Sequence, residues 1–198
     1  MLFRSERAAA EATCQALELS MKRPGASATV IESDVSGVVG PLAEHIRVEA
    51  GAEHAVAAVL GDLADAVVVR SRSAAVEAVT ILKDSGVGRA ALVVLDQVAA
   101  DPHTSEPPRG VWLRSTVTCD SGLAGIMDVL LRNVVLIPSL GEVPEGDAYA
   151  DVTWTTPDGD LWRHGTLLGG TPATGSLVEI QAAYDSSRAA ADELIRTS

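Results

Sequence analysis

The chain has 198 residues, of which 47% are hydrophobic and only 3% aromatic, and its formal net charge is -12. This length and apolar content suit one ordinary domain, or two small ones that share an aliphatic core, and they exclude a largely disordered chain. The acidic charge argues against general binding to phosphate backbones.

Cysteine usage and hydropathy bear on the cellular compartment. Cys14 and Cys119 lie far apart in no metal-ligand spacing, so a reduced protein is expected. No apolar run approaches the roughly 20 residues of a membrane span, and the first residues lack a signal-peptide pattern. We therefore expect a cytoplasmic protein with no membrane partner.

Both ends of the chain have the periodicity of amphipathic helices. Apolar positions recur at alternating spacings of four and three, with Arg7 as a charged exception, at Phe3, Arg7, Ala10, Cys14, Leu17 and Met21 and again at Leu177, Ile180, Tyr184, Ser187, Ala191 and Leu194. Ser176 and Glu179 form a capping-box pattern in front of the second stripe. Two readings stay open: ordinary amphipathic helices, or an antiparallel pair of coiled-coil helices.

The middle of the chain alternates helices and strands. We predict a helix over 54–60, a strand over 66–70, a helix over 73–83 and a strand over 90–95, which together make a βαβ-type unit. After a Pro-rich loop over 97–110 we predict a helix over 122–130 and strands over 133–138, 151–155 and 161–168, with a turn at 157–160.

This pattern predicts an α/β (α+β) fold of two small, pseudo-similar halves with mixed sheets, flanked by antiparallel helices. The predicted units are an incoming helix (1–23), a first half (24–100), an inter-half loop (101–114), a second half (115–175) and an outgoing helix (176–198).

Residues 167–181, LLGGTPATGSLVEIQ, resemble a phosphate-binding loop. Gly170 and Gly175 have the separation of a P-loop, but Ser176 occupies the position where that motif requires lysine. A small nucleotide-binding enzyme using residues 169–176 is therefore the alternative hypothesis, and a glycine-rich connection into a capped helix is the favoured one. The four histidines show no metal-binding motif, and no G-x-S-x-G pattern marks a catalytic serine.

Glycines gather at the ends of the predicted strands. They are Gly37, Gly40, Gly86, Gly88, Gly165, Gly169 and Gly170. Glycine at such positions serves turn geometry, or lets the backbone of another chain approach closely, or both. Interfaces made by strand edges need short strands with small neighbours of this kind.

Four sequence blocks follow one another in order between about residues 35 and 185: GVVGPLAEHIRVEAGAEHAVAAVLGDLADAVVVRS, AAVEAVTILKDSGVGRAALVVL, NVVLIPSLGEV and TPDGDLWRHGTLLGGTPATGSLVEIQAAYD. Together they resemble the hinge domain of SMC (structural maintenance of chromosomes) proteins. The acidic, Ala- and Val-rich style resembles that of actinobacterial proteins.

The resemblance implies a non-catalytic dimerisation module that joins two long coiled-coil arms in chromosome condensation and segregation. In such a homodimer the first half of one chain joins the second half of the other. The residues implied at this interface are Gly86, Gly88, Arg89, Gly165, Gly169 and Gly170. The implied coiled-coil seam includes Leu17, Met21, Leu177, Ile180, Tyr184 and Leu194. ATP, Mg and kleisin-type partners would belong to head domains outside this chain, so no cofactor is expected here.

The resemblance also implies DNA contact near the coiled-coil junction. Residues 24–175 hold 9 Lys and Arg against 20 Asp and Glu, whereas the two flanks hold 6 against 7. We therefore expect any DNA footprint at Lys22, Arg23 and Arg188, and we expect the binding to be weak and salt-sensitive.

Overall fold

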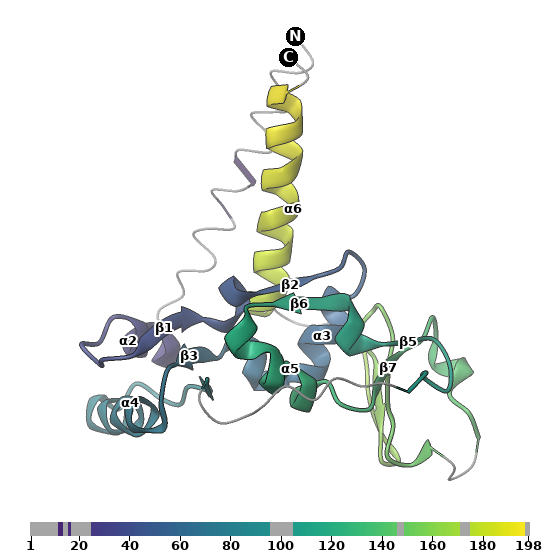
Figure 1. Ribbon diagram of the computed structural model, residues 1–198, viewed down its shortest axis with the longest axis horizontal. Helices are drawn as coiled ribbons and strands as arrows, with labels where there is room; N and C mark the ends of the chain where they lie inside the picture. Colours follow the sequence, from purple (N-terminus) through teal and green to yellow (C-terminus); the bar gives the residue numbers. More distant parts are fainter. Residues whose placement is uncertain are drawn as a thin grey trace.

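Two small sheets lie at opposite ends of the molecule's long axis, and one long helix, α6 (Leu177–Arg196), rises between them (Figure 1). The structure is a computed structural model that describes residues 12, 13, 16, 25–95, 105–145, 149–170 and 175–196. Residues 12, 13 and 16 are helical. Cys14, Leu17, Met21, Lys22 and Arg23 lie outside the described residues, so the predictions made for them stay predictions.

The first half is a three-stranded sheet covered by two helices. Its strands, in spatial order, are β1 (Val38–Pro41), β3 (Val67–Val69) and β4 (Leu92–Val94). Its helices are α2 (Ala26–Ile31) and α4 (Arg72–Ser85). All three residues of β3 are buried, as expected of a central strand with a β-branched run. Because α4 connects β3 to the parallel strand β4, the predicted βαβ unit is confirmed.

The second half is a five-stranded mixed sheet. Its strands, in spatial order, are β10 (Thr166–Leu168), β9 (Leu161–Arg163), β8 (Thr153–Thr155), β7 (Val134–Leu136) and β5 (Val111–Trp112). Strand β5 comes from residues that we assigned to the inter-half loop. The prediction of a single strand over 161–168 is wrong, because His164 and Gly165, with φ of 47° and 74°, fold this segment into a second hairpin.

A two-stranded ribbon joins the halves at the centre of the molecule. Strand β2 (Ile46–Val48) pairs antiparallel with β6 (Val117–Cys119), with Arg47 opposite Thr118. Each strand follows a 3-10 turn, η1 (Leu42–His45) or η3 (Leu113–Thr116), that itself follows the first strand of its half. Each half then contains an antiparallel and a parallel strand pair in the same order. The two halves are therefore pseudo-similar in topology, as predicted.

One hydrophobic core serves both halves and the foot of α6. The remaining helical elements are α3 (Glu53–Leu60), η2 (Gly61–Asp65), η4 (Ser121–Leu123), α5 (Ala124–Leu130) and η5 (Leu140–Glu142). Buried side chains from both halves and from α6 form a single cluster that includes Leu42, Val56, Val68, Leu113, Leu123, Met127 and Val178. Since Val178 belongs to this cluster, the base of α6 is anchored in the core. In the described part of the chain, no helix is long and apolar enough to cross a membrane.

Candidate functional site

Two strand edges, one in each of the two larger sheets, are open. Strand β4 is the last strand of the first sheet and β10 is the last strand of the second. Leu92 and Val94 of β4 are half-buried, and the turn before β4 exposes Val87. In β10 all three residues are exposed, with Leu167 58% and Leu168 63% accessible. An open strand edge that carries exposed leucines is a template for pairing with another chain.

The strands at the other ends of these two sheets, β1 and β5, are protected against such pairing. Strand β1 contains Pro41, which has no backbone N–H, and its register with β3 shifts between Val38 and Gly40. Strand β5 is only two residues long. Short strands, proline and bulges are the usual means of blunting a sheet edge. Of the four terminal strands of these two sheets, β4 and β10 are thus the ones suited to an interface.

The predicted interface glycines cluster at these two edges. Gly86 ends α4 in a left-handed conformation, and its N–H donates to the Leu82 carbonyl over 3.1 Å. Gly165 is the second residue of the two-residue turn between β9 and β10. These two glycines have a sufficient reason within their own chain. Gly88 and Gly170 also have positive φ, of 108° and 112°, and a Cβ at any of these four glycines would meet no described atom within 4 Å, which leaves room beside all four for another backbone.

Gly169 is crowded by its own chain. A Cβ at this position would collide with the carboxylate of Asp160, which lies in the turn between β8 and β9. The same carboxylate accepts a hydrogen bond from the N–H of Gly170 over 3.3 Å. The absence of a side chain at Gly169 therefore lets the end of β10 close onto this turn.

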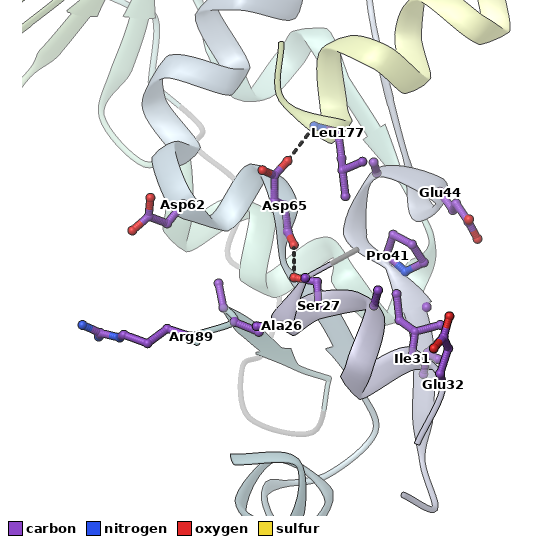
Figure 2. Close-up of a pocket in the computed structure, with 17 residues that line it drawn as sticks. Ala26, Ser27, Ile31, Glu32, Pro41, Glu44, Asp62, Asp65, Arg89 and Leu177 are labelled. Carbon is purple, nitrogen blue, oxygen red and sulfur yellow. Dashed lines mark hydrogen bonds between the residues drawn. The ribbon is translucent and has the colours of Figure 1, made fainter. Parts of the chain in front are cut away.

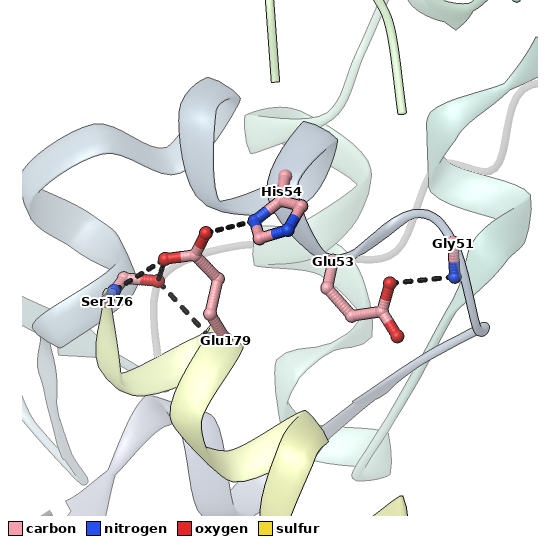
Figure 3. Close-up of polar contacts among 5 residues, drawn as sticks. All are labelled: Gly51, Glu53, His54, Ser176 and Glu179. Carbon is pink, nitrogen blue, oxygen red and sulfur yellow. Dashed lines mark hydrogen bonds and ion pairs between the residues drawn. The ribbon is translucent and has the colours of Figure 1, made fainter. Parts of the chain in front are cut away.

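Helix α6 begins with the predicted capping box. The N–H of Ser176 donates to Glu179 Oε2 over 2.5 Å, and the N–H of Glu179 donates to Ser176 Oγ over 3.3 Å (Figure 3). Asp65 adds a remote cap, because its carboxylate accepts the N–H of Leu177 over 2.6 Å, while its carbonyl accepts the hydroxyl of Ser27 in α2 over 3.2 Å (Figure 2). Asp65 thus links both α2 and the first residue of α6 to η2.

A hydrogen bond and an ion pair fix the side of α6 to the body. His54 in α3 donates through Nδ1 to Glu179 (Figure 3), and Arg47 in β2 contacts Asp185 over 3.0 Å. Burial raises the pKa of Glu179, but hydrogen bonds from the Ser176 amide, His54 and the Ser176 hydroxyl outweigh it and hold this pKa below its usual value. Glu179 is therefore an ionised anchor for the base of the helix.

A cavity of about 1300 Å³ lies beside this junction (Figure 2). It is lined by α2, η1, η2, Leu177 and the residues before β4, including Arg89. Four acidic residues, Glu32, Glu44, Asp62 and Asp65, also line it. At the described ends of the glycine-rich loop, carboxylates already accept the N–H groups of Gly170, Ser176 and Leu177. A phosphate would need those same donors, and the carboxylates beside them would repel it.

The predicted seam positions of α6 lie on its more covered side. Ile180 is 8% exposed, and Leu177 and Tyr184 are half-buried, while Arg188 is exposed and donates to the Tyr184 hydroxyl over 3.2 Å. The side chain of Leu194 lies outside the described set. The assignment of these residues to a coiled-coil seam and of Arg188 to a DNA contact stays a prediction.

No described group resembles a catalytic or metal centre. In the described ranges, no cluster of three His, Cys, Asp or Glu side chains could hold a metal ion. Burial raises the pKa of the Cys119 thiol, with Arg114 opposing it, so this thiol is a poor nucleophile at neutral pH.

The fold, the two open edges and the capped helix junction define a class of protein. A family model described as the flexible hinge domain of SMC proteins matches residues 35–143, which is more than half of the chain. The chain belongs to this family, as the sequence resemblance predicted.

Its curated relatives include chromosome partition proteins Smc of mycobacteria. The protein of Mycolicibacterium paratuberculosis is 32% identical over 181 residues, covering 90% of this chain, and that of Mycobacterium tuberculosis is 31% identical over 188 residues, covering 91%. The chain spans only 15% and 16% of the lengths of these relatives.

Solved structures of SMC hinges share the fold. An asymmetric dimer of the Geobacillus stearothermophilus SMC hinge domain matches with a TM-score of 0.79 at 24% identity, covering 99% of this chain and 86% of that chain. The Pyrococcus furiosus SMC hinge domain matches with a TM-score of 0.63 at 25% identity, covering 82% of this chain and 89% of that chain.

Sequence reasoning missed several residues that the structure brings to the site. Leu167 and Leu168 were assigned to a hairpin strand, and their exposure was not anticipated, because an apolar strand is normally taken as core. Asp65, His54 and Arg47 reach α6 from distant positions. Their only sequence signal is a polar side chain near a strand or helix end, which is too common to single them out.

Proposed function

We propose that the chain forms a homodimer through its two open edges, β4 of one copy pairing with β10 of the other. The observation that carries this proposal is the exposure of Leu167 and Leu168 on a terminal strand. Pairing would supply partners for the unpaired backbone groups of both edges and bury the leucines. Because β4 and β10 belong to different sheets, two copies related by a two-fold axis would make both contacts at once.

The dimer would join two coiled-coil arms at a hinge without catalytic activity. Helix α6 is anchored in the core and capped by Asp65 and Glu179, which suits a helix that continues away from the body as an arm. The curated relatives are chromosome partition proteins, so the proposed role is chromosome condensation and segregation at the nucleoid. Kleisin-type partners, ATP and Mg would act at heads outside this chain, which itself would take no nucleotide or other cofactor.

DNA contact at the junction is the second, finer part of the proposal. In the sequence, Lys22 and Arg23 precede the body and Arg188 follows it, whereas the body itself is strongly acidic. Contact would therefore be confined to the junction, weak, and sensitive to salt.

The dimer is tested by the mass of the protein in solution. Sedimentation equilibrium at micromolar concentration should give twice the 20.5 kDa mass of one chain. Leu167→Glu should raise the dimer dissociation constant about 30-fold or more, because a charge would replace an apolar side chain at the centre of the interface. Val129→Glu, at a 50% exposed position on α5, is the matched control and should leave the dimer intact. A one-chain mass for the wild type, or an undiminished dimer of Leu167→Glu, contradicts the proposal.

A further inference from the structure

The hairpin that ends in β10 is fixed to the turn at residues 156–160. Strand β10 pairs with β9, and β9 is joined to β8 by the turn at residues 156–160. Asp160 in this turn accepts the N–H of Gly170, just beyond β10. The turn itself is tightly fixed, since the N–H of Thr156 donates to the Asp160 carbonyl over 3.1 Å and the N–H of Asp160 donates to Thr156 Oγ1 over 3.2 Å.

The same turn packs against the start of α3. A Cβ built at Gly159 would lie 3.0 Å from the carbonyl oxygen of His54 and 3.3 Å from its Cβ, so only glycine allows this approach. The backbone of Gly159 has a φ of 85°, and its N–H donates to the Thr156 carbonyl over 2.9 Å. The turn at residues 156–160 therefore lies directly against the backbone of His54.

His54 connects this turn to α6. Its side chain is 55% exposed, but its Nδ1 is held by Glu179, whose side chain is only 12% exposed. Glu179 also accepts the N–H of Ser176 and thereby closes the first turn of α6 (Figure 3). The Glu179 carboxylate thus binds His54, which lies against the turn at residues 156–160, and also accepts the N–H that caps α6.

We infer that His54 couples the dimer edge to the outgoing arm: pairing at β10 steadies the hairpin, and the hairpin, through Gly159 and His54, steadies Glu179 and the first turns of α6. The inference rests on the proposed dimerisation and adds a residue that transmits it. Coupling between two sites is reciprocal, so loosening the base of α6 at His54 must also weaken the dimer.

A separate contact between α6 and the body supplies a control variant for this coupling. Arg47 and Asp185 also tie α6 to the body, over 3.0 Å, but Arg47 lies in β2 rather than against the hairpin turn. Removing this pair loosens α6 without touching the contact between Gly159 and His54. A general effect of loosening the helix is thereby separated from an effect along the hairpin route.

The first measurement is the dimer dissociation constant of the whole chain by sedimentation equilibrium. His54→Phe keeps the Cβ that faces Gly159 but removes the hydrogen bond, and it should raise the dissociation constant about fivefold or more. Asp185→Asn should change it less than twofold. Glu179→Gln, which retains an acceptor for the Ser176 N–H, is a second variant and should behave like His54→Phe. Circular dichroism confirms that each variant is folded.

The second measurement is hydrogen exchange of the amides of residues 179–185. In the wild type these amides should exchange about fivefold more slowly in the dimer than in the monomeric variant Leu167→Glu. In His54→Phe that difference should disappear. Equal exchange in wild-type dimer and monomer, or equal weakening of the dimer by His54→Phe and Asp185→Asn, refutes the coupling while leaving dimerisation standing. A wild type of one-chain mass refutes the dimer and the coupling with it.

Discussion

Asp160 shows how one side chain organises the end of the β9–β10 hairpin. Its carboxylate holds the N–H of Gly170 and occupies the space where Gly169 would carry a Cβ. The structure therefore gives Gly169 a role within its own chain, in addition to the close approach of a partner that the sequence resemblance implies.

This role predicts a non-additive pair of substitutions. In the monomeric Leu167→Glu background, Gly169→Ala should lower the free energy of unfolding by about 1–2 kcal/mol, because Asp160 must move and release the Gly170 N–H. After Asp160→Ala the same change should cost less than about 0.5 kcal/mol, since the collision is gone. Denaturant unfolding measures the loss of unfolding free energy in each background. Equal losses would show that the Asp160 carboxylate is not the reason for glycine at position 169.

Single residues differ in how far sequence alone could place them. Ser176 and Glu179 were predicted as a capping box because their partners are three residues apart. His54 is 125 residues from Glu179 and Asp65 is 112 residues from Leu177. Contacts over such separations depend on how the halves fold together, and one sequence contains no local signal for them.

At the scale of elements, α6 depends on an ionised glutamate at its base. The pKa of Glu179 is lowered in the folded protein. Its stabilising contribution is therefore complete above the ordinary glutamate pKa of about 4.3 and is lost as the pH falls through the lower folded value.

This sign predicts the acid sensitivity of the helix junction. Between pH 6 and pH 3 the free energy of unfolding of the wild type should fall more steeply than that of Glu179→Gln, which has no such group to protonate. Glu77→Gln, at an exposed position on α4, is the matched control and should parallel the wild type. Denaturant unfolding across this pH range gives the comparison, and superimposable curves for wild type and Glu179→Gln would exclude an anchoring charge.

Long periodic or β-branched segments were predictable at this scale, and short irregular ones were not. Helices α3 and α4 and strands β3, β4, β7 and β8 fall within or close to the predicted ranges. Strands β3, β4, β7 and β8 also have only three residues, but the sequence predicted strands there, whereas β2, β5 and β6 had no such local signal and are defined by their pairing with distant segments. The turn at His164 was missed because a non-glycine residue with positive φ is uncommon.

For the whole molecule, charge distribution decides where DNA can bind. A gel shift on single- and double-stranded DNA should show weak binding at about 50 mM salt that is largely lost by about 200 mM. Changing Lys22, Arg23 and Arg188 together to Gln should abolish it, whereas Arg72→Gln on the exposed start of α4 should have little effect. Absence of any shift at low salt, or equal loss with Arg72→Gln, would remove the junction as a DNA site.

Because each chain has two open strand edges, it can make two separate pairings with other chains. The two edges are unlike, so a first contact between β10 and β4 leaves a second, complementary pair of edges free. Within a closed pair this second contact forms at a high effective concentration, because the chains are already tethered. Either contact can then open and re-form without the chains separating. If closure were blocked, the same two edges would join molecules head to tail into open chains.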